Sequence, residues 1–408
     1  MVFQAGITPR WKLPIQTSTT DAARLEGRTT THGNLTVQKL DDIADLAALI
    51  PEWTAIDGAA RPRSPFTSPA WLLPWWNHFQ RRNIIIRDEF FSHAVRNRDG
   101  QLVAIAPLMR SFMPGIGLPM LRILQFFGND PSLTEFRGVI CRHDDHDEVI
   151  RTLFAHFLAR RHEWDVFRIH GLRRGAADYT ATLPAGSLTG RRELPDYVLP
   201  LPPSWEVLKA RVSSNMRKNL RKAYETLERD GVRFGMRVIE AETEVAAAIS
   251  RFLALHTARA AAADMVTHPH KFHTAHARAF LSECLLRMAS RHQLRIFELE
   301  VDGAVVASRL AFLFEDVLYL YFAGYDPAWR QYSVMTVLMA ELIQWALGNG
   351  VREINLSTGN DQSKLRWRPE EILLYEAVLI SPARRGKMAF QAYRAYQRAA
   401  NLRTKLRP

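Results

Sequence analysis

Cysteine is scarce in this 408-residue sequence, which has only Cys141 and Cys284. Two cysteines cannot form the disulfide framework of a small secreted protein, and neither lies in a paired Cys or His ligand motif. We therefore expect both to be buried thiols in a protein of the reducing cytosol.

Long hydrophobic runs are also missing. The opening residues, MVFQAGITPRWKL, have no apolar run behind their positive charges. No window of the sequence approaches the roughly 18 uncharged apolar residues that a membrane span requires. The sequence therefore predicts a cytoplasmic protein without a signal peptide or a transmembrane helix.

Acidic residues are the third shortage. The chain has 54 Lys and Arg against 42 Asp and Glu, a formal net charge of +12. This excess favours anionic partners, but it does not distinguish coenzyme phosphates from nucleic acid or anionic lipid. The hydrophobic content of 47% is ordinary for a globular protein, and the length suits two domains or more.

The pattern of predicted elements divides the chain into four parts. Residues 1 to 34 contain few large apolar residues and predict a flexible tail. Helices, a hairpin, a strand, a crossover helix and a further strand then occur twice, in residues 35 to 200 and 201 to 381. We therefore predict the α/β class, with two similar units whose mixed sheets are flanked by helices. Residues 382 to 408 contain no acid and predict a basic C-terminal helix.

Two stretches of the first unit give specific expectations. The segment TSPAWLLPWWNHF predicts a helix with Ser68 as its cap, and its Trp71, Trp75 and Trp76 are expected in the core. The runs IIIRDEFFSHAVRN and QLVAIAPLMR are joined by an RDG turn and predict a β-hairpin.

The second unit opens with an amphipathic helix in SSNMRKNLRKAYETLERDG whose charges oppose its dipole. Arg217, Lys218, Arg221 and Lys222 lie in the first turns, where positive charge costs roughly 0.3–1 kcal/mol per exposed residue. One interpretation is a solvated charged face whose cations pair with acids elsewhere in the fold. The other is a binding site for an anion.

A strand, a loop and a helix follow one another between residues 317 and 348. The strand at 317 to 323 leads to a helix that begins near Ser333. First-turn N–H groups have no partner within a helix, so this arrangement predicts an anion site to which Arg330 adds charge.

The run AGYDPAWRQYSVMTVLMAELIQWALGNGVREINLSTGNDQSKLRW, with SSNMRKNLRKAYETLERDG and VDGAVVASRLAF upstream, resembles the GNAT acyltransferase superfamily. Within it, the sequence is most similar to the cellulose-biosynthesis-associated (CelD-like) group, which is related to Fem-type peptidyl transferases with tandem GNAT units. The resemblance covers roughly residues 35 to 380, including PFTSPAWLLPWW in the first unit. It implies an acyl-CoA-dependent N-acyltransferase, with acetyl-CoA or another acyl-CoA as co-substrate and no metal.

The resemblance also implies where the coenzyme binds. Tyr319, Phe322 and Ala323 of the strand would contact the pantetheine arm. The backbone around Arg330, Gln331, Tyr332, Ser333 and Val334 would hold the pyrophosphate. Superfamily members typically have glycine in this loop, where this chain has Ser333 and Val334. Backbone N–H groups do not require glycine where the local dihedral angles are helical.

For catalysis, the family pattern of an acid, a glycine, a Tyr-Lys pair and an aromatic corresponds to Asn355, Gly359, Ser363, Lys364 and Trp367. Lys364 is expected to stabilise negative charge or hold a phosphate, and Tyr321 is assigned to the catalytic set. Asp361 is the nearest carboxylate able to act as a base, with a turn role as its alternative.

The acceptor is expected in a cleft between the two units. The resemblance would place the basic helix there, so Arg217, Lys218, Arg221 and Lys222 are assigned to an anionic acceptor. His256 and Trp367 complete the predicted acceptor site. The histidines of HPHKFHTAH lack Cys or carboxylate ligands at suitable spacing, so we expect no metal and leave acceptor lining or a surface role open.

The predicted function is N-acylation of a small or saccharide amine in polysaccharide or cell-envelope synthesis. Two alternatives stay open: a Fem-type transferase that uses aminoacyl-tRNA as donor, and a catalytically silent binding protein. Nucleic acid is expected as a partner only in the tRNA alternative. The basic C-terminus is expected to contact a membrane surface or a polyanion peripherally.

Overall fold

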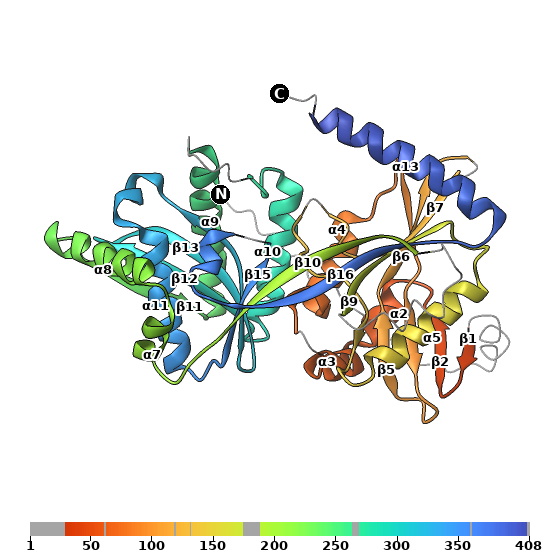
Figure 1. Cartoon of the computed structure of the whole chain (residues 1–408), viewed down its shortest axis with the longest axis horizontal. Coiled ribbons are helices and arrows are strands. Elements are labelled where there is room, and N and C mark those ends of the chain that lie inside the picture. The colour runs from red at the N-terminus through yellow and green to blue at the C-terminus, as the bar shows by residue number, and fades with distance from the viewer. Residues whose placement is uncertain are drawn as a thin grey trace, which may run out of the picture.

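The structure, a computed structural model, describes residues 29–60, 63–117, 120–130, 132–173, 188–262, 269–359 and 361–405. Helices flank two sheets, which confirms the predicted α/β class (Figure 1). The first half contains β1 (Thr29–His32), β2 (Leu35–Lys39), α2 (Ile43–Ala48), α3 (Ile50–Gly58), η1 (Pro65–Thr67), α4 (Pro69–Phe79), β3 (Arg87–Phe90), β4 (His93–Arg96), β5 (Leu102–Ala106), β6 (Leu108–Met113), β7 (Leu121–Phe126), β8 (Ile140–Cys141), α5 (His146–Ala159), β9 (Val166–Arg173) and β10 (Leu188–Pro200).

The second half follows directly from β10. It contains α7 (Trp205–Arg211), α8 (Ser214–Arg229), β11 (Phe234–Ile239), α9 (Glu242–Ala261), α10 (Ala275–Ala289), β12 (Leu294–Val301), β13 (Ala304–Phe314), β14 (Val317–Tyr325), η2 (Pro327–Tyr332), α11 (Val334–Gly348), β15 (Glu353–Thr358), α12 (Gln362–Leu365), β16 (Glu370–Ile380) and α13 (Arg384–Lys405).

One sheet of 11 strands runs through both halves, in the order β11-β12-β13-β14-β15-β10-β16-β9-β7-β6-β3. The long strands β10 and β16 cross the middle of the molecule and belong to both halves (Figure 1). A second sheet of five strands, in the order β1-β2-β4-β5-β8, lies in the first half. The two predicted units are therefore joined by shared strands.

The predicted tail is shorter than expected. Residues 1–28 lie outside the described part, but Thr29–His32 already form β1, which pairs antiparallel with β2. Gly33 adopts a positive φ of 61° in the turn between them, a conformation that glycine reaches without a steric penalty. Regular structure is thus already present at residue 29, within the segment predicted as a tail.

The hairpin predicted from residues 84 to 110 is divided between the two sheets. Its inner strands, β4 and β5, pair as expected in the five-stranded sheet. The outer strands, β3 and β6, pair in the 11-stranded sheet. Pro107 lies between β5 and β6 and has no N–H to donate, so the ladder is interrupted where the chain changes sheet.

The tryptophans of α4 are core residues, as predicted. Trp71, Trp75 and Trp76 are buried, and Trp71 packs edge-on against Phe280 of α10, with ring centroids 5.0 Å apart. Helix α4 therefore contributes to one hydrophobic core with α9 and α10. A second core, on the other face of the sheet, contains α8 and α11.

Strands β14 and β15 open a gap in the sheet. They pair in parallel only at Val317, Leu318 and Tyr319, opposite residues 353 to 355, and then diverge. Helix α9 covers one side of this gap, because Gly324 of β14 has no side chain and the backbone of α9 can approach it. A Cβ at Gly324 would lie 2.4 Å from the His256 backbone nitrogen. The divergence leaves the later residues of β14 without a strand partner on that side.

Candidate functional site

A cavity of about 300 Å³ lies where β14 and β15 diverge. It is bounded by α9, β13, the first turns of α11 and α12, and a loop of the first half. Its walls are formed by Glu135, Arg259, Arg309, Tyr321, Phe322, Ala323, Met335, Met339, Leu356, Ser357, Thr358, Asp361, Ser363, Lys364, Arg366 and Trp367. Both halves of the chain therefore contribute to one cavity.

Positive charge dominates the walls of this cavity. Four cations, Arg259, Arg309, Lys364 and Arg366, face two carboxylates, Glu135 and Asp361. Burial and, to a smaller extent, the charge of Arg259 lower the pKa of Arg309 to about 10. Burial also lowers the pKa of Lys364 and of Arg366. Such a group of half-buried cations is costly unless an anion compensates it.

Two observations indicate where an anion would bind. The Nε of Arg309 is buried and has no hydrogen-bond acceptor among the described residues. Arg366 Nη2 donates to Thr336 Oγ1 (3.4 Å), which places its guanidinium beside the first turn of α11. A helix N-terminus attracts anions through its free N–H groups, so the cations and the helix act on the same region.

Lys364 is held in place by the end of β15. Its Nζ donates to the carbonyl oxygens of Thr358 (2.7 Å) and Ser357 (3.2 Å). These bonds fix the ammonium group on the cavity wall. Trp367, one turn further on, is buried beside it, and its Nε1 has no acceptor among the described residues.

Glu135 is the carboxylate that the first half adds to the cavity. Its Oε2 accepts a hydrogen bond from the Tyr319 hydroxyl (2.6 Å). Burial raises the pKa of this carboxyl group and the Asp196 carboxylate adds to the rise, although Tyr319, Ser357 and Lys364 oppose it. A raised pKa is what proton transfer near neutral pH requires of a carboxyl group.

Helix α4 and strand β14 anchor the loop that carries Glu135. Trp71 Nε1 donates to Thr134 Oγ1 (3.0 Å), and Trp75 Nε1 donates to Asp130 Oδ2 (2.9 Å). The Tyr321 hydroxyl donates to the Leu133 carbonyl (2.6 Å). Trp71 and Trp75 thereby help to position Glu135. This residue belongs to the first half, but it lies where β14 and β15 diverge in the second half.

Asp361 is the N-cap of the short helix α12. Its Oδ1 accepts from the backbone N–H of Ser363 (2.8 Å), as the turn alternative anticipates. Burial favours the protonated form of this carboxyl group, but bonds from Ser363 and the charges of Lys364 and Arg259 outweigh it and lower the pKa. A carboxylate with a lowered pKa is a weak proton acceptor.

The predicted coenzyme strand divides into two parts. Tyr321, Phe322 and Ala323 line the cavity. Tyr319 lies where β14 is partnered on both sides, opposite Phe312 of β13 and Asn355 of β15, and its hydroxyl binds Glu135. Its backbone is therefore less accessible to a ligand than that of the later residues.

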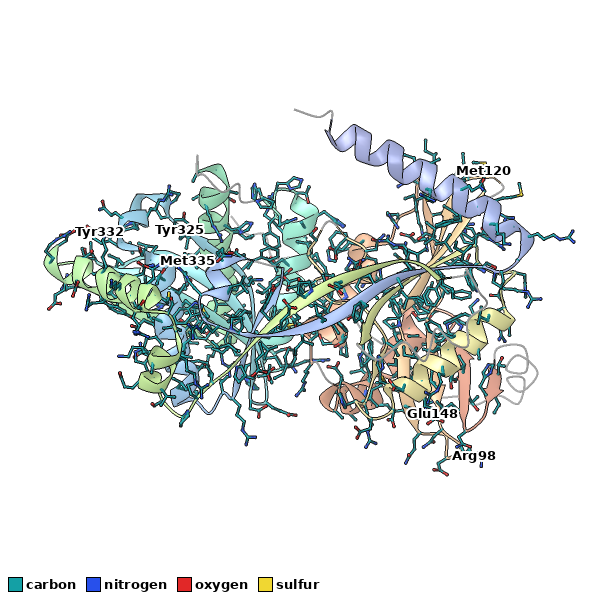
Figure 2. All side chains as sticks on the ribbon, in the orientation of Figure 1. Arg98, Met120, Glu148, Tyr325, Tyr332 and Met335 are labelled. Atoms are coloured by element: carbon teal, nitrogen blue, oxygen red, sulfur yellow. The ribbon has the colours of Figure 1, made fainter. Side chains whose placement is uncertain are left out.

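The loop expected to hold the pyrophosphate forms η2, and Ser333 follows it directly. Met335 on the cavity wall comes two residues later, and Tyr332 lies towards α8 (Figure 2). Ser333 does not meet the condition of right-handed helical dihedral angles, because it has φ 53° and ψ 39° in the left-handed region. This is the conformation that glycine adopts without strain.

The basic helix α8 does not lie between the two halves. It packs against α11 and η2, at the end of the molecule away from the first half (Figure 1). Arg217, Lys218, Arg221 and Lys222 are exposed beside a groove between α7 and α8. The predicted junction position is thus wrong, because the apolar face of α8 covers α11 and not the cavity.

Partners within the same region explain the reversed charges of α8. Arg217 Nη1 donates to the Val212 carbonyl (2.6 Å) at the C-terminus of α7, where positive charge is favourable. Arg221 lies 3.5 Å from Glu225, one helical turn away. Both arginines therefore have partners within α7 and α8, and not the acids elsewhere in the fold that the solvated-face interpretation expects.

The predicted histidines lie next to the cavity and not in its wall. His256 is buried, and its Nδ1 lies 3.2 Å from the Ala323 carbonyl. His270 and His273 are neighbours, with ring centroids 6.1 Å apart, and His268 lies outside the described residues. Within the described ranges, no group of three or more His, Cys, Asp or Glu is arranged to bind a metal ion.

Sequence reasoning missed Glu135, Arg259, Arg309 and Arg366. For Arg309 a signal existed, because a lone cation in the apolar strand VASRLAF must be buried. No such signal existed for Glu135, since it lies in an irregular segment of the first half.

Comparisons with known proteins show similarities of family and of fold. Residues 214–365 match the acetyltransferase (GNAT) domain family. A crystal structure of a conserved protein of unknown function from Bacteroides thetaiotaomicron shares 14% identity, covers 84% of this chain and 99% of its own, and gives a TM-score of 0.51. The crystal structure of FemX shares 9% identity, covers 80% of this chain and 95% of its own, and gives 0.54. No curated protein matches the sequence. Residues 214–365 are thus similar to the GNAT acetyltransferase domain, and most of the chain has a fold similar to that of FemX.

Proposed function

We propose that the chain is an acyl-CoA-dependent N-acyltransferase, specifically an acetyltransferase, that acts on an amine. The observation that carries this proposal is the cluster of four cations at the divergence of β14 and β15, beside the first turn of α11. Buried cations and a helix N-terminus together suit the phosphates of a coenzyme.

The residues present fit an acyl-CoA. The unpaired Nε of Arg309 and the guanidinium of Arg366 would hold phosphate oxygens. The part of β14 from Tyr321 to Ala323 has no strand partner on the β15 side and would hold the pantetheine arm. When bound, the coenzyme supplies an activated acyl group as a thioester.

Glu135 is the proposed general base. An amine must lose a proton to become an acylated product, and the Glu135 carboxyl group has a raised pKa on the cavity wall. Replacing it with glutamine keeps its size and removes the base. Glu135→Gln should lower kcat by about 10²–10⁴-fold while acetyl-CoA still binds. Loss of acetyl-CoA binding in this variant would show that Glu135 supports the cavity and is not a base.

Lys364 is the proposed donor for negative charge that develops during acyl transfer. Its ammonium group is already oriented by Thr358 and Ser357, so little reorganisation is needed. Trp367 and the aliphatic wall beside it exclude water from this end of the cavity. Asp361 fixes the start of α12 and thereby the position of Lys364.

The acceptor is proposed from the sequence motifs. Membership of the CelD-like group, and with it polysaccharide or cell-envelope synthesis, is supported by the resemblance of the sequence motifs. Across the described residues, every helix is too short or too polar to cross a lipid bilayer. We retain a small or saccharide amine as the acceptor and the cytoplasm as its place of action.

Calorimetric titration tests the coenzyme site. Acetyl-CoA should bind, and Arg366→Ala should weaken binding by about 10–100-fold, the value of one charged hydrogen bond. Arg352→Ala is the matched control, since Arg352 is 84% exposed and pairs with Asp316. Absence of binding to any acyl-CoA, with salt-dependent binding of aminoacyl-tRNA instead, would replace this proposal by the Fem-type alternative.

A further inference from the structure

Large apolar side chains are exposed together at one end of the 11-stranded sheet. Ile84, Ile85, Ile116 and Met120 are 68%, 59%, 63% and 70% exposed. Scattered exposed apolar residues are normal, but a group of large ones on one surface requires an explanation. We call these four residues the apolar tip.

The chain topology brings the apolar tip together. Ile84 and Ile85 precede β3, while Ile116 and Met120 lie between β6 and β7. Arg87 pairs with Phe112, and Met113 pairs with Leu121, so both segments leave the sheet at the same end. Gly115 N–H donates to the Ile84 carbonyl (3.0 Å). A Cβ at Gly115 would overlap the Asn83 carbonyl oxygen, so glycine permits this contact.

Helix α13 extends the same surface. Ala389 packs with Leu121 and Ile123 of β7, and Met120 lies beside the helix (Figure 2). Met388 on this helix is 76% exposed. The helix therefore adds another apolar side chain next to the tip.

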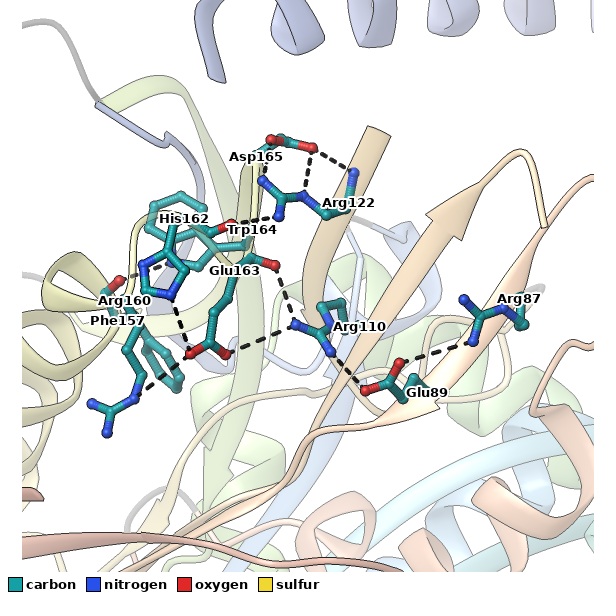
Figure 3. Close-up of polar contacts among 10 residues, drawn as sticks. All are labelled: Arg87, Glu89, Arg110, Arg122, Phe157, Arg160, His162, Glu163, Trp164 and Asp165. Carbon is teal, nitrogen blue, oxygen red and sulfur yellow. Dashed lines mark hydrogen bonds and ion pairs between the residues drawn. The ribbon is translucent and has the colours of Figure 1, made fainter. Parts of the chain in front are cut away.

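Two acids at this end of the sheet, Glu89 and Asp165, are paired with arginines. Glu89 binds Arg110 (2.7 Å), and Asp165 binds Arg122 (2.8 Å) (Figure 3). Asp165 also lies 3.3 Å from Arg385. Arg122 also donates to the His162 carbonyl. These pairs fix the strands below the tip and offset the charges of Glu89 and Asp165, while Asp41 and Asp42 line the same cavity as Ile84 and Ile116.

Exposed cations surround the tip instead. Arg82 precedes Ile84, and Arg384, Lys387 and Arg394 are exposed on α13. Residues 381 to 408 contain no Asp or Glu. Apolar side chains that project from a positively charged surface match the two layers of an anionic bilayer, with its charged headgroups and its acyl chains.

We propose that the apolar tip and α13 form a surface that binds an anionic lipid bilayer peripherally. The isoleucines and methionines enter the headgroup boundary, and the arginines and lysine of α13 contact lipid phosphates. This inference is independent of the proposed catalytic function, because the surface lies in the first half and on α13, away from the cavity between β14 and β15.

Cosedimentation with vesicles tests the proposal. The full chain should bind vesicles of phosphatidylglycerol and phosphatidylcholine, and bind vesicles of phosphatidylcholine alone much less. Ile84→Asp with Ile116→Asp should lower the partition coefficient by about 100-fold. Arg384→Glu with Lys387→Glu should lower it by about 10-fold or more, and added salt should reduce the remaining binding.

Leu286→Asp provides the matched control, since Leu286 is 45% exposed on α10 in the other half. It should leave vesicle binding unchanged, and circular dichroism should show all variants folded. Absence of vesicle binding by the native chain overturns the proposal. Binding that Ile84→Asp with Ile116→Asp leaves intact, or binding to heparin and RNA alone, overturns it too, because a polyanion site does not need the tip.

Discussion

Replacement of Arg309 by methionine should make the protein more stable and its ligand binding weaker. Burial and the charge of Arg259 lower the pKa of Arg309 from its usual value to about 10. At about 1.4 kcal/mol for each factor of ten, the charged form loses roughly 3 kcal/mol on folding. Methionine has a similar length and no charge. Arg309→Met should therefore raise the free energy of unfolding by about 1–3 kcal/mol in the absence of ligand.

The same variant should bind acetyl-CoA about 10–100-fold more weakly, since a charged hydrogen bond to phosphate is lost. Urea unfolding and calorimetric titration measure the two effects. Arg233→Met is the control for the substitution itself, because Arg233 is 91% exposed and should change neither quantity. A loss of stability would show that the guanidinium is well compensated without ligand. A gain in stability with unchanged acetyl-CoA affinity would mean that the anion binds elsewhere.

Three further predictions concern separate regions. Ser333→Gly should raise the free energy of unfolding by up to about 1 kcal/mol and keep acetyl-CoA binding, because glycine tolerates the left-handed conformation; a less stable variant would contradict this. Burial lowers the pKa of His93 and lowers that of His156 from 6.5 to about 3, so below pH 6.5 protons bind the unfolded chain preferentially. Stability should then fall by up to about 1.4 kcal/mol per pH unit for each histidine, and unfolding of His93→Phe should depend less on pH. Arg217→Ala should cost about 1 kcal/mol by uncapping α7 without changing the acceptor KM, and a raised KM would restore the acceptor role of α8.

Local sequence patterns predicted the helices and strands of the fold better than they predicted which strands pair with each other. The strand, loop and helix from Val317 to Gly348 follow from apolar periodicity and the glycines that end the helix. Periodicity could not show that β3 and β4 belong to different sheets, since residues 84 to 97 form one continuous β-rich run in the sequence. Nor could it show that β16 lies between β10 and β9. Such pairings depend on contacts between residues that are distant in the sequence.

The same limit applies to the candidate site, where residues close in the sequence were predicted and a distant one was missed. Lys364, Asp361, Trp367 and the end of β14 follow one another within the second half, and the structure places them in one cavity. The basic α8 had the same sequence character, but its apolar face decided its position on α11. Glu135 comes from the other half of the chain, where no residue pattern indicates a partner in β14.

The position of β16 constrains the order in which the protein can mature during synthesis. Strands β9, β7, β6 and β3 connect to β10 only through β16, whose residues are translated after almost the whole chain. Until residue 380 leaves the ribosome, β9 and β10 each expose an edge that β16 will occupy. The nascent first half must therefore keep two sheet edges from aggregating while the second half is made. A fragment that ends at residue 200 would retain those edges permanently.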